Sequence, residues 1–109
     1  MKTSITVEKM ANDDSLIKIQ GDDWELNIHM KNDEMPLLKS LRSADWNKRA
    51  SIKAGTSADA SVFWAFDTKE QLVCILVGHD DETWDFAVTI PIAEFTEKWY
   101  TYQDDKKST

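Results

Sequence analysis

Alternation of apolar and polar residues over short segments is the feature that most constrains the fold of this chain. In the clearest case, one face of residues 24–30 carries Trp24, Leu26, Ile28 and Met30. The residues between them are Glu25, Asn27 and His29. A period of two places the apolar set on one side of an extended chain. The segment is therefore predicted to be a strand with one buried face.

Six further segments carry strand signals and are separated by polar turns such as 12–14 and 67–71. They are residues 5–7, 16–19, 50–54, 62–66, 72–77 and 84–90. Segment 72–77 is apolar on both faces, which is typical of a central strand with cover on each side. In segment 84–90 the alternation predicts one apolar row that begins with Trp84.

Two helices are expected beside these strands. The first begins near Asn32 and Asp33, which can cap a helix, and fades around residues 43–47. Its predicted buried stripe is Leu37, Leu38 and Leu41. The second begins after Pro91, and its predicted stripe is Ile92, Phe95, Trp99 and Tyr102.

The element order is therefore β-β-β-α-β-β-β-β-α. It predicts an α+β domain over residues 1–103, with one twisted, mainly antiparallel sheet of about seven strands and two helices packed on a face. Residues 104–109 are expected to form a solvated tail. The pattern does not specify the strand order.

Length and apolar runs limit the class of protein. A chain of 109 residues suits one core. The longest apolar run, 72–77, is far shorter than the roughly 20 residues of a membrane helix. The first ten residues lack a continuous apolar region, so we expect a cytoplasmic protein with no membrane partner. The lone Cys74 lies inside an apolar run and is expected to be an inert core thiol.

No motif for metal binding or catalysis is found. The acids at 80–82 are crowded and lack the ligand spacing of a calcium loop, and His29 lies some fifty residues from His79. Ser57 is not in a nucleophile-elbow context, and the three glycines form no phosphate loop. We therefore expect no metal, no cofactor and no enzymatic activity.

Charge is distributed in three blocks that sum to −7. Residues 1–36 carry −4, residues 37–57 carry +4 and residues 58–109 carry −7. The basic residues of the middle block are Lys39, Arg42, Lys48, Arg49 and Lys53. They either pair with the acidic turns or form a second contact zone. Free nucleic acid would be repelled by most of this surface, whereas a basic protein would be attracted.

An internal similarity points to two turns. GDDWELNI at 21–28 and HDDETWDFAVTI at 79–90 each place an acidic turn and a tryptophan before an alternating strand. Trp24 and Trp84 are either the first core residues of their strands or exposed anchors for a partner. Trp46 either covers the end of the first helix or is an anchor too. The predicted contact acids are Asp22, Asp23, Glu25, Asp80, Asp81, Glu82 and Asp85.

In its general build, as a small, acidic, tryptophan-rich α+β domain, the chain resembles the immunity proteins of bacterial toxin systems, those of contact-dependent growth inhibition above all. The resemblance implies a monomer that binds one cognate toxin domain in a 1:1 complex and blocks its active site. The toxin would often be a basic nuclease. A phage or plasmid anti-defence protein that mimics nucleic acid, and a non-catalytic adaptor subunit, are the alternatives.

Overall fold

The computed structural model describes residues 3–95. Within them, seven strands form one sheet in sequence order, and every neighbouring pair is antiparallel. The strands are β1 (Ser4–Lys9), β2 (Ser15–Gln20), β3 (Glu25–Met30), β4 (Ile52–Ser57), β5 (Ala60–Asp67), β6 (Leu72–Gly78) and β7 (Trp84–Pro91). The predicted α+β class with an antiparallel sheet is confirmed, and the strand order is a simple meander.

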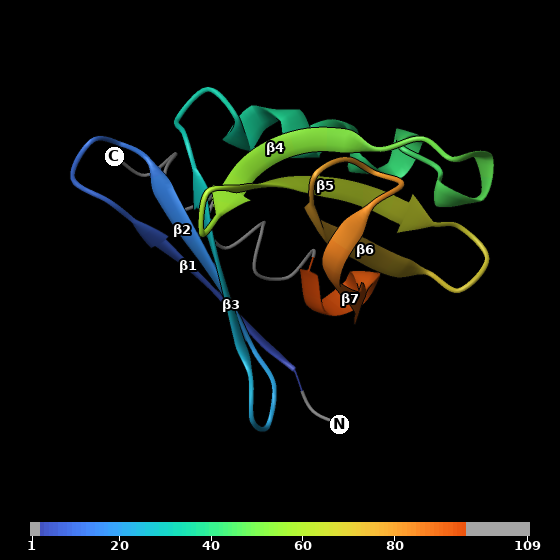
Figure 1. Cartoon of the computed structure of the whole chain (residues 1–109), viewed down its shortest axis with the longest axis horizontal. Helices are drawn as coiled ribbons and strands as arrows, with labels where there is room; N and C mark the ends of the chain where they lie inside the picture. Colours follow the sequence, from blue (N-terminus) through green and yellow to red (C-terminus); the bar gives the residue numbers. More distant parts are fainter. Residues whose placement is uncertain (1–2, 96–109) are drawn as a thin grey trace.

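The sheet is sharply bent between β3 and β4. These two strands share one aligned pair, His29 with Thr56, whereas β1, β2 and β3 pair with one another along their whole lengths. Figure 1 shows β1–β3 crossing the direction of β4–β7 at a steep angle. The bend turns one face of both halves inward, and this inner face carries the core.

The core is a single cluster that draws on both halves of the sheet. In β3 the residues Leu26, Ile28 and Met30 are buried, as the alternation predicts. Trp64 of β5 is fully buried in the same cluster, and its indole Nε1 donates to the Ala54 carbonyl at 2.8 Å. This hydrogen bond satisfies the one polar atom of the largest core side chain.

Strands β5 and β6 are buried on their outer face as well. The outer-facing residues there are Phe63, Ala65, Cys74 and Leu76. The prediction that residues 72–77 are buried on both faces is therefore confirmed. The prediction of a central strand is wrong, because β6 lies next to the edge of the sheet. Burial raises the pKa of the Cys74 thiol, which disfavours the reactive thiolate.

The first predicted helix is a 3₁₀ helix, η1 (Met35–Ser43). Its buried residues Met35, Leu38 and Leu41 recur every third position, which matches three residues per turn. The expectation for Leu37 is wrong, because that side chain is 45% exposed. A periodicity of 3.6 includes position 37 in the stripe, whereas a periodicity of three excludes it.

A short 3₁₀ turn, η2 (Trp46–Lys48), follows, and the Asp45 carboxylate caps it by accepting from the Asn47 amide at 3.0 Å. After β7, residues 92–95 are helical and Phe95 is buried, as predicted. The predicted contacts of Trp99 and Tyr102 and the tail 104–109 lie outside the described residues. No helix within 3–95 is long and apolar enough to cross a membrane.

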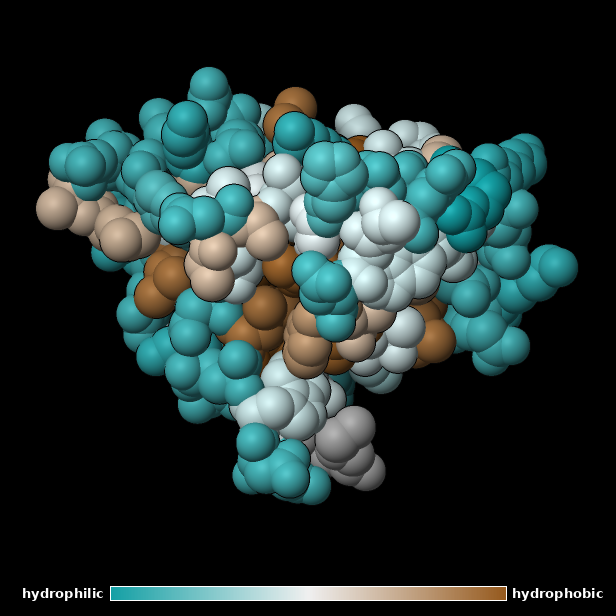
Figure 2. All heavy atoms as spheres, in the orientation of Figure 1, coloured by the Kyte–Doolittle hydropathy of each residue, from teal (hydrophilic) through white to brown (hydrophobic). Residues whose placement is uncertain are grey.

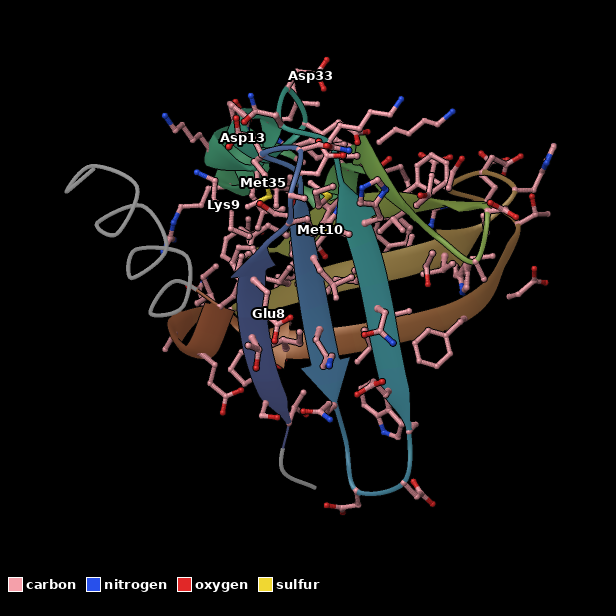
Figure 3. All side chains as sticks on the ribbon, turned by 90° about the vertical axis from the view of Figure 1, so that its left-hand side faces the viewer. Glu8, Lys9, Met10, Asp13, Asp33 and Met35 are labelled. Atoms are coloured by element: carbon pink, nitrogen blue, oxygen red, sulfur yellow. The ribbon has the colours of Figure 1, made fainter. Side chains whose placement is uncertain are left out.

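The outer face of β1–β3 is polar and is seen face on in Figure 3. Glu8 lies on the outermost strand β1, and Lys9, Met10 and Asp13 mark the β1–β2 turn. Lys9 Nζ lies 3.2 Å from Asp13 Oδ1 in an exposed ion pair. This edge of the sheet therefore carries charged side chains of both signs.

Gly55 is the residue on which the bend depends. Its φ is +85°, and it lies within the register shift of β4 between Lys53 and Thr56. A Cβ atom at this position would lie 2.5 Å from Met30 Sδ and 2.9 Å from Ile28 Cγ2. The Gly55 amide donates to Glu34 Oε2 at 2.9 Å, which ties the bend to the chain before η1.

Replacing Gly55 with alanine should therefore destabilise the fold by about 1–3 kcal/mol, because the new methyl group meets the core and the left-handed backbone is strained. Urea unfolding measures the change. Ala58→Gly is the matched control. Because Ala58 has a φ of +49°, a glycine there should raise the free energy of unfolding by roughly 0.5–1 kcal/mol. Equal stability of Gly55→Ala and wild type would contradict this role for the bend.

Candidate functional site

The turn between β6 and β7 is organised by Asp80. Its Oδ1 accepts hydrogen bonds from the Glu82 amide (2.8 Å), the Thr83 amide (2.7 Å) and the Thr83 hydroxyl (2.7 Å). These bonds, the one from the Thr83 hydroxyl above all, hold the pKa of Asp80 below its ordinary value. Asp80 was predicted to contact a partner, and its Oδ1 also holds the local turn.

Asp81 fixes the same turn to residues 49–51. The Ser51 hydroxyl donates to Asp81 Oδ2 at 2.9 Å, and the Arg49 guanidinium donates to the Asp81 carbonyl at 3.4 Å. Arg49 also lies over the ring of Trp46, with its Cζ 4.3 Å from the ring centroid. Asp81 is therefore half-buried and serves mainly to hold the turn in place.

Trp84 and Phe86 lie on opposite faces of β7. Trp84 aligns with Gly78 and Phe86 with Val77, and the register shifts between these pairs, so Asp85 is an extra residue at a bulge. The prediction of one continuous apolar row starting at Trp84 is therefore wrong. Both side chains are 37% exposed, so neither is a core residue.

Each of these two rings is held by another aromatic ring. Trp84 packs edge-on against Trp46 on the outer face, with 5.9 Å between centroids and an interplanar angle of 68°. Phe86 packs edge-on against Trp24, with 5.8 Å and 61°. We call these four rings the aromatic surface. The contacts position the exposed rings without covering them fully.

Trp24 owes its position to a glycine. The Gly21 amide donates to the Trp24 carbonyl at 2.9 Å, and a Cβ at Gly21 would collide with the indole ring. The ring is partly buried against the core, so of the two interpretations the core one describes it better. Gly78 lies equally close to the backbone of Trp84. The similarity of the two segments thus extends to a glycine packed against each tryptophan.

The remaining predicted acids fall into two groups. Glu25 accepts from Gln20 Nε2 at 2.8 Å and from Asn27 Nδ2 at 3.0 Å, so its carboxylate is held on the surface of β3. Asp22, Asp23, Glu82 and Asp85 are exposed, and within residues 3–95 their carboxylates have no hydrogen bond or ion pair. We call these four the unpaired acids.

The two acidic turns do not form one continuous rim. Figure 1 places the β2–β3 turn at the lower end of the molecule and the β6–β7 turn above its middle. The segments meet instead through Trp24 and Phe86. Figure 2 shows apolar atoms exposed in the angle between β1–β3 and β4–β7. The site is therefore an aromatic centre with acids at its two ends.

Three of the contributing residues were missed or left open by the sequence. Phe86 was assigned to a core row, because no local signal reveals the bulge at Asp85. Arg49 was one of five basic residues, and its stacking on Trp46 could not be read from spacing. Trp46 was left with two interpretations, and its ring is half-buried and packs on Trp84.

Within the described part of the chain, no group of three or more histidine, cysteine, aspartate or glutamate side chains is arranged to hold a metal ion. His29 Nε2 lies 3.0 Å from Asp14 Oδ2 on the polar face of β3. None of the five basic residues of the middle block forms an ion pair within residues 3–95, so their predicted pairing with the acidic turns is not found.

The Asp80 carboxyl should titrate below the ordinary aspartate value of 3.8. Because its folded pKa lies below its unfolded pKa, the turn gains stability above about pH 4, and this gain is lost as pH falls through the folded pKa. Carbon-detected NMR titration of the side chain measures the shift. Asp80→Asn should loosen the Glu82 and Thr83 amides in hydrogen exchange, whereas Glu82→Gln should not. A titration at or above 3.8 would contradict the assignment.

The chain was compared with protein-family models, with curated proteins and with solved structures, and none of them matches it. Two properties distinguish the surface around β7: aromatic rings that are held in place yet exposed, and carboxylates that no residue of the described chain neutralises.

Proposed function

We propose that this protein is a stoichiometric inhibitor, an immunity protein that binds a basic toxin domain and occludes its active site. One observation carries the proposal. Trp84 and Phe86, each 37% exposed, stand at the start of an edge strand, with the unpaired acid Asp85 between them and the unpaired acid Glu82 two residues before Trp84. Aromatic anchors with charge at the rim are the usual composition of a tight protein interface.

The aromatic rings are suited to hold a partner. Because Trp46 and Trp24 already restrain Trp84 and Phe86, little rotamer entropy remains to be lost when a partner covers them. Burial of such rings removes apolar area from water at roughly 25 cal/mol per Å². The rings are therefore expected to determine how slowly the complex dissociates.

The acids are suited to attract a cationic partner. Residues 70–97 contain seven acids and no lysine or arginine. Arg49 touches this hairpin by donating to a backbone carbonyl and also stacks on Trp46, and within residues 3–95 it forms no ion pair with a carboxylate. A cluster of unneutralised charge raises association rates strongly at low ionic strength. A scattered exposed ion pair would contribute only about 0–1 kcal/mol to affinity.

A nuclease is the class of toxin that this chemistry fits best. Its active site binds phosphates through arginine and lysine, and carboxylates form charge-assisted hydrogen bonds with the same groups. The unpaired acids can therefore occupy phosphate positions while the rings cover the rim of the site. Direct mimicry of a nucleic acid strand would need a longer continuous row of acids than two separated turns provide.

Co-expression with basic toxin domains, those encoded nearest to this gene first, tests the proposal. We expect the wild-type chain to restore growth and to form a 1:1 complex in size-exclusion chromatography with light scattering. Glu8→Gln, on the far edge strand β1, is the matched control and should protect equally well. Failure to bind any neighbouring basic domain, with the chain folded, would refute the inhibitor function.

Kinetics should separate the two parts of the surface. The double variant Glu82→Gln, Asp85→Asn should lower the association rate about three- to tenfold in low salt, with little effect on dissociation. Trp84→Ala should instead raise the dissociation rate tenfold or more. The double variant Glu8→Gln, Glu70→Gln, with one change on β1 and one in the turn at the other end of β6, is the control for two lost charges. Stopped-flow binding measures both rates, and an unchanged association rate in low salt would remove the electrostatic component.

A further inference from the structure

We propose that the partner is captured by strand addition: an extended, lysine- or arginine-bearing segment pairs with the open edge of β7 as an eighth strand. This inference rests on the proposed function for its cationic partner and specifies how the partner is held. The combination that carries it is an open backbone edge, aromatic rings on both faces of that edge, and an excess of negative charge around it.

The edge of β7 is open within the described chain. The strand lies at the end of the sheet order, and among residues 3–95 no strand pairs with its outer side. Residues 84–87 and Thr89 are exposed although the adjacent β6 is buried. A long exposed edge of this kind is a template for pairing with another chain.

The backbone groups available for pairing follow from the register. The Ile92 amide donates to the Gln71 carbonyl at 3.0 Å, so this pair occupies a hydrogen-bonding position of the antiparallel ladder. The backbone of Pro91, one residue earlier, is therefore directed away from β6. Every second residue before it has the same orientation, which gives Thr89 and Ala87. Their N–H and C=O groups point to the open edge.

The two edges of the sheet differ in their protection. At β1 the exposed Glu8 and the Lys9–Asp13 ion pair place charges of both signs along the edge, as is typical of strands that avoid pairing. Strand β7 has a bulge at Asp85 and a proline at its last position, and no lysine. Between them, residues 86–90 are regular and unprotected, which is sufficient for a short added strand.

The side chains around this edge specify what is added. Successive residues of an added strand point to opposite faces, where Trp84 lies on one side and Phe86 on the other. A second copy of this chain, paired antiparallel through residues 86–90, would place the acidic hairpin 79–85 beside Glu94 of the other copy, which like-charge repulsion opposes. A segment that alternates apolar and basic residues complements both the rings and the charge.

The probe is a fluorescein-labelled eight-residue peptide of alternating lysine and valine. Fluorescence anisotropy should detect binding, and the Ala87 and Thr89 amides should shift in nitrogen-15 NMR spectra. Ala87→Pro removes an outward N–H without removing a bond to β6, and should weaken binding at least fivefold. Ala87→Val keeps that N–H and is the matched control, so it should bind as wild type does.

Peptide controls keep the test independent of how well Ala87→Pro folds. A glutamate–valine peptide should not bind, and a lysine–valine peptide N-methylated at every residue, which has no free N–H on either edge, should lose at least fivefold in affinity. Equal binding of the methylated peptide, or amide shifts confined to other strands, would overturn strand addition. Concentration-dependent dimerisation of the chain through Ala87 and Thr89 would also overturn it, in favour of self-pairing. The proposed function is judged separately, by the toxin co-expression assay.

Discussion

The bend between β3 and β4 is the constraint on which the rest of the molecule depends. A single aligned pair joins these strands, and Gly55 combines a left-handed backbone with the absence of a side chain where β4 meets Met30 and Ile28. The bend turns the two halves of the sheet toward each other and lets one cluster of side chains serve both. It also brings the start of β3 against β7, sixty residues later, so that Trp24 meets Phe86. A flat meander of the same strands would leave these rings far apart.

A second irregularity, the bulge at the start of β7, gives the site its two-sided character. The extra residue at Asp85 sends Trp84 to the outer face and leaves Phe86 on the inner one. On the outer face Trp84 packs on Trp46, which Arg49 restrains. On the inner face Phe86 packs on Trp24, which lies against Gly21. Rings held in this way remain exposed because the strand that carries them has no neighbour on its outer side within residues 3–95.

The sequence predicted the features that neighbouring residues determine, such as strands and their buried faces. It did not predict the features that depend on contacts between distant residues. The alternation at Leu26, Ile28 and Met30 identified a strand and its buried face, because period two leaves little choice. In η1 the sequence identified the element but not its type, since Met35, Leu38 and Leu41 also fit a helix of 3.6 residues per turn. The bulge could not be predicted, because Trp84, Phe86 and Val88 alternate regularly with other residues in the sequence, as they would in a strand without a bulge. Their exposure follows from the position of β7 at the edge, which no local pattern encodes.

The acids of the two similar segments fall into two groups, those that hold the fold and those without a bonding partner in the described chain. Asp80 and Asp81 accept hydrogen bonds that shape and anchor their turn, and Glu25 is bonded to its strand neighbours. Their presence is thus explained by folding, as is each glycine packed against a tryptophan. Asp22, Asp23, Glu82 and Asp85 have no such explanation within residues 3–95. An unneutralised carboxylate beside an exposed ring contributes nothing to the core and adds self-repulsion in a chain of charge −7. The proposed cationic partner would neutralise these carboxylates, and within residues 3–95 the open edge of β7 is where the rings, the charge and the unpaired backbone coincide.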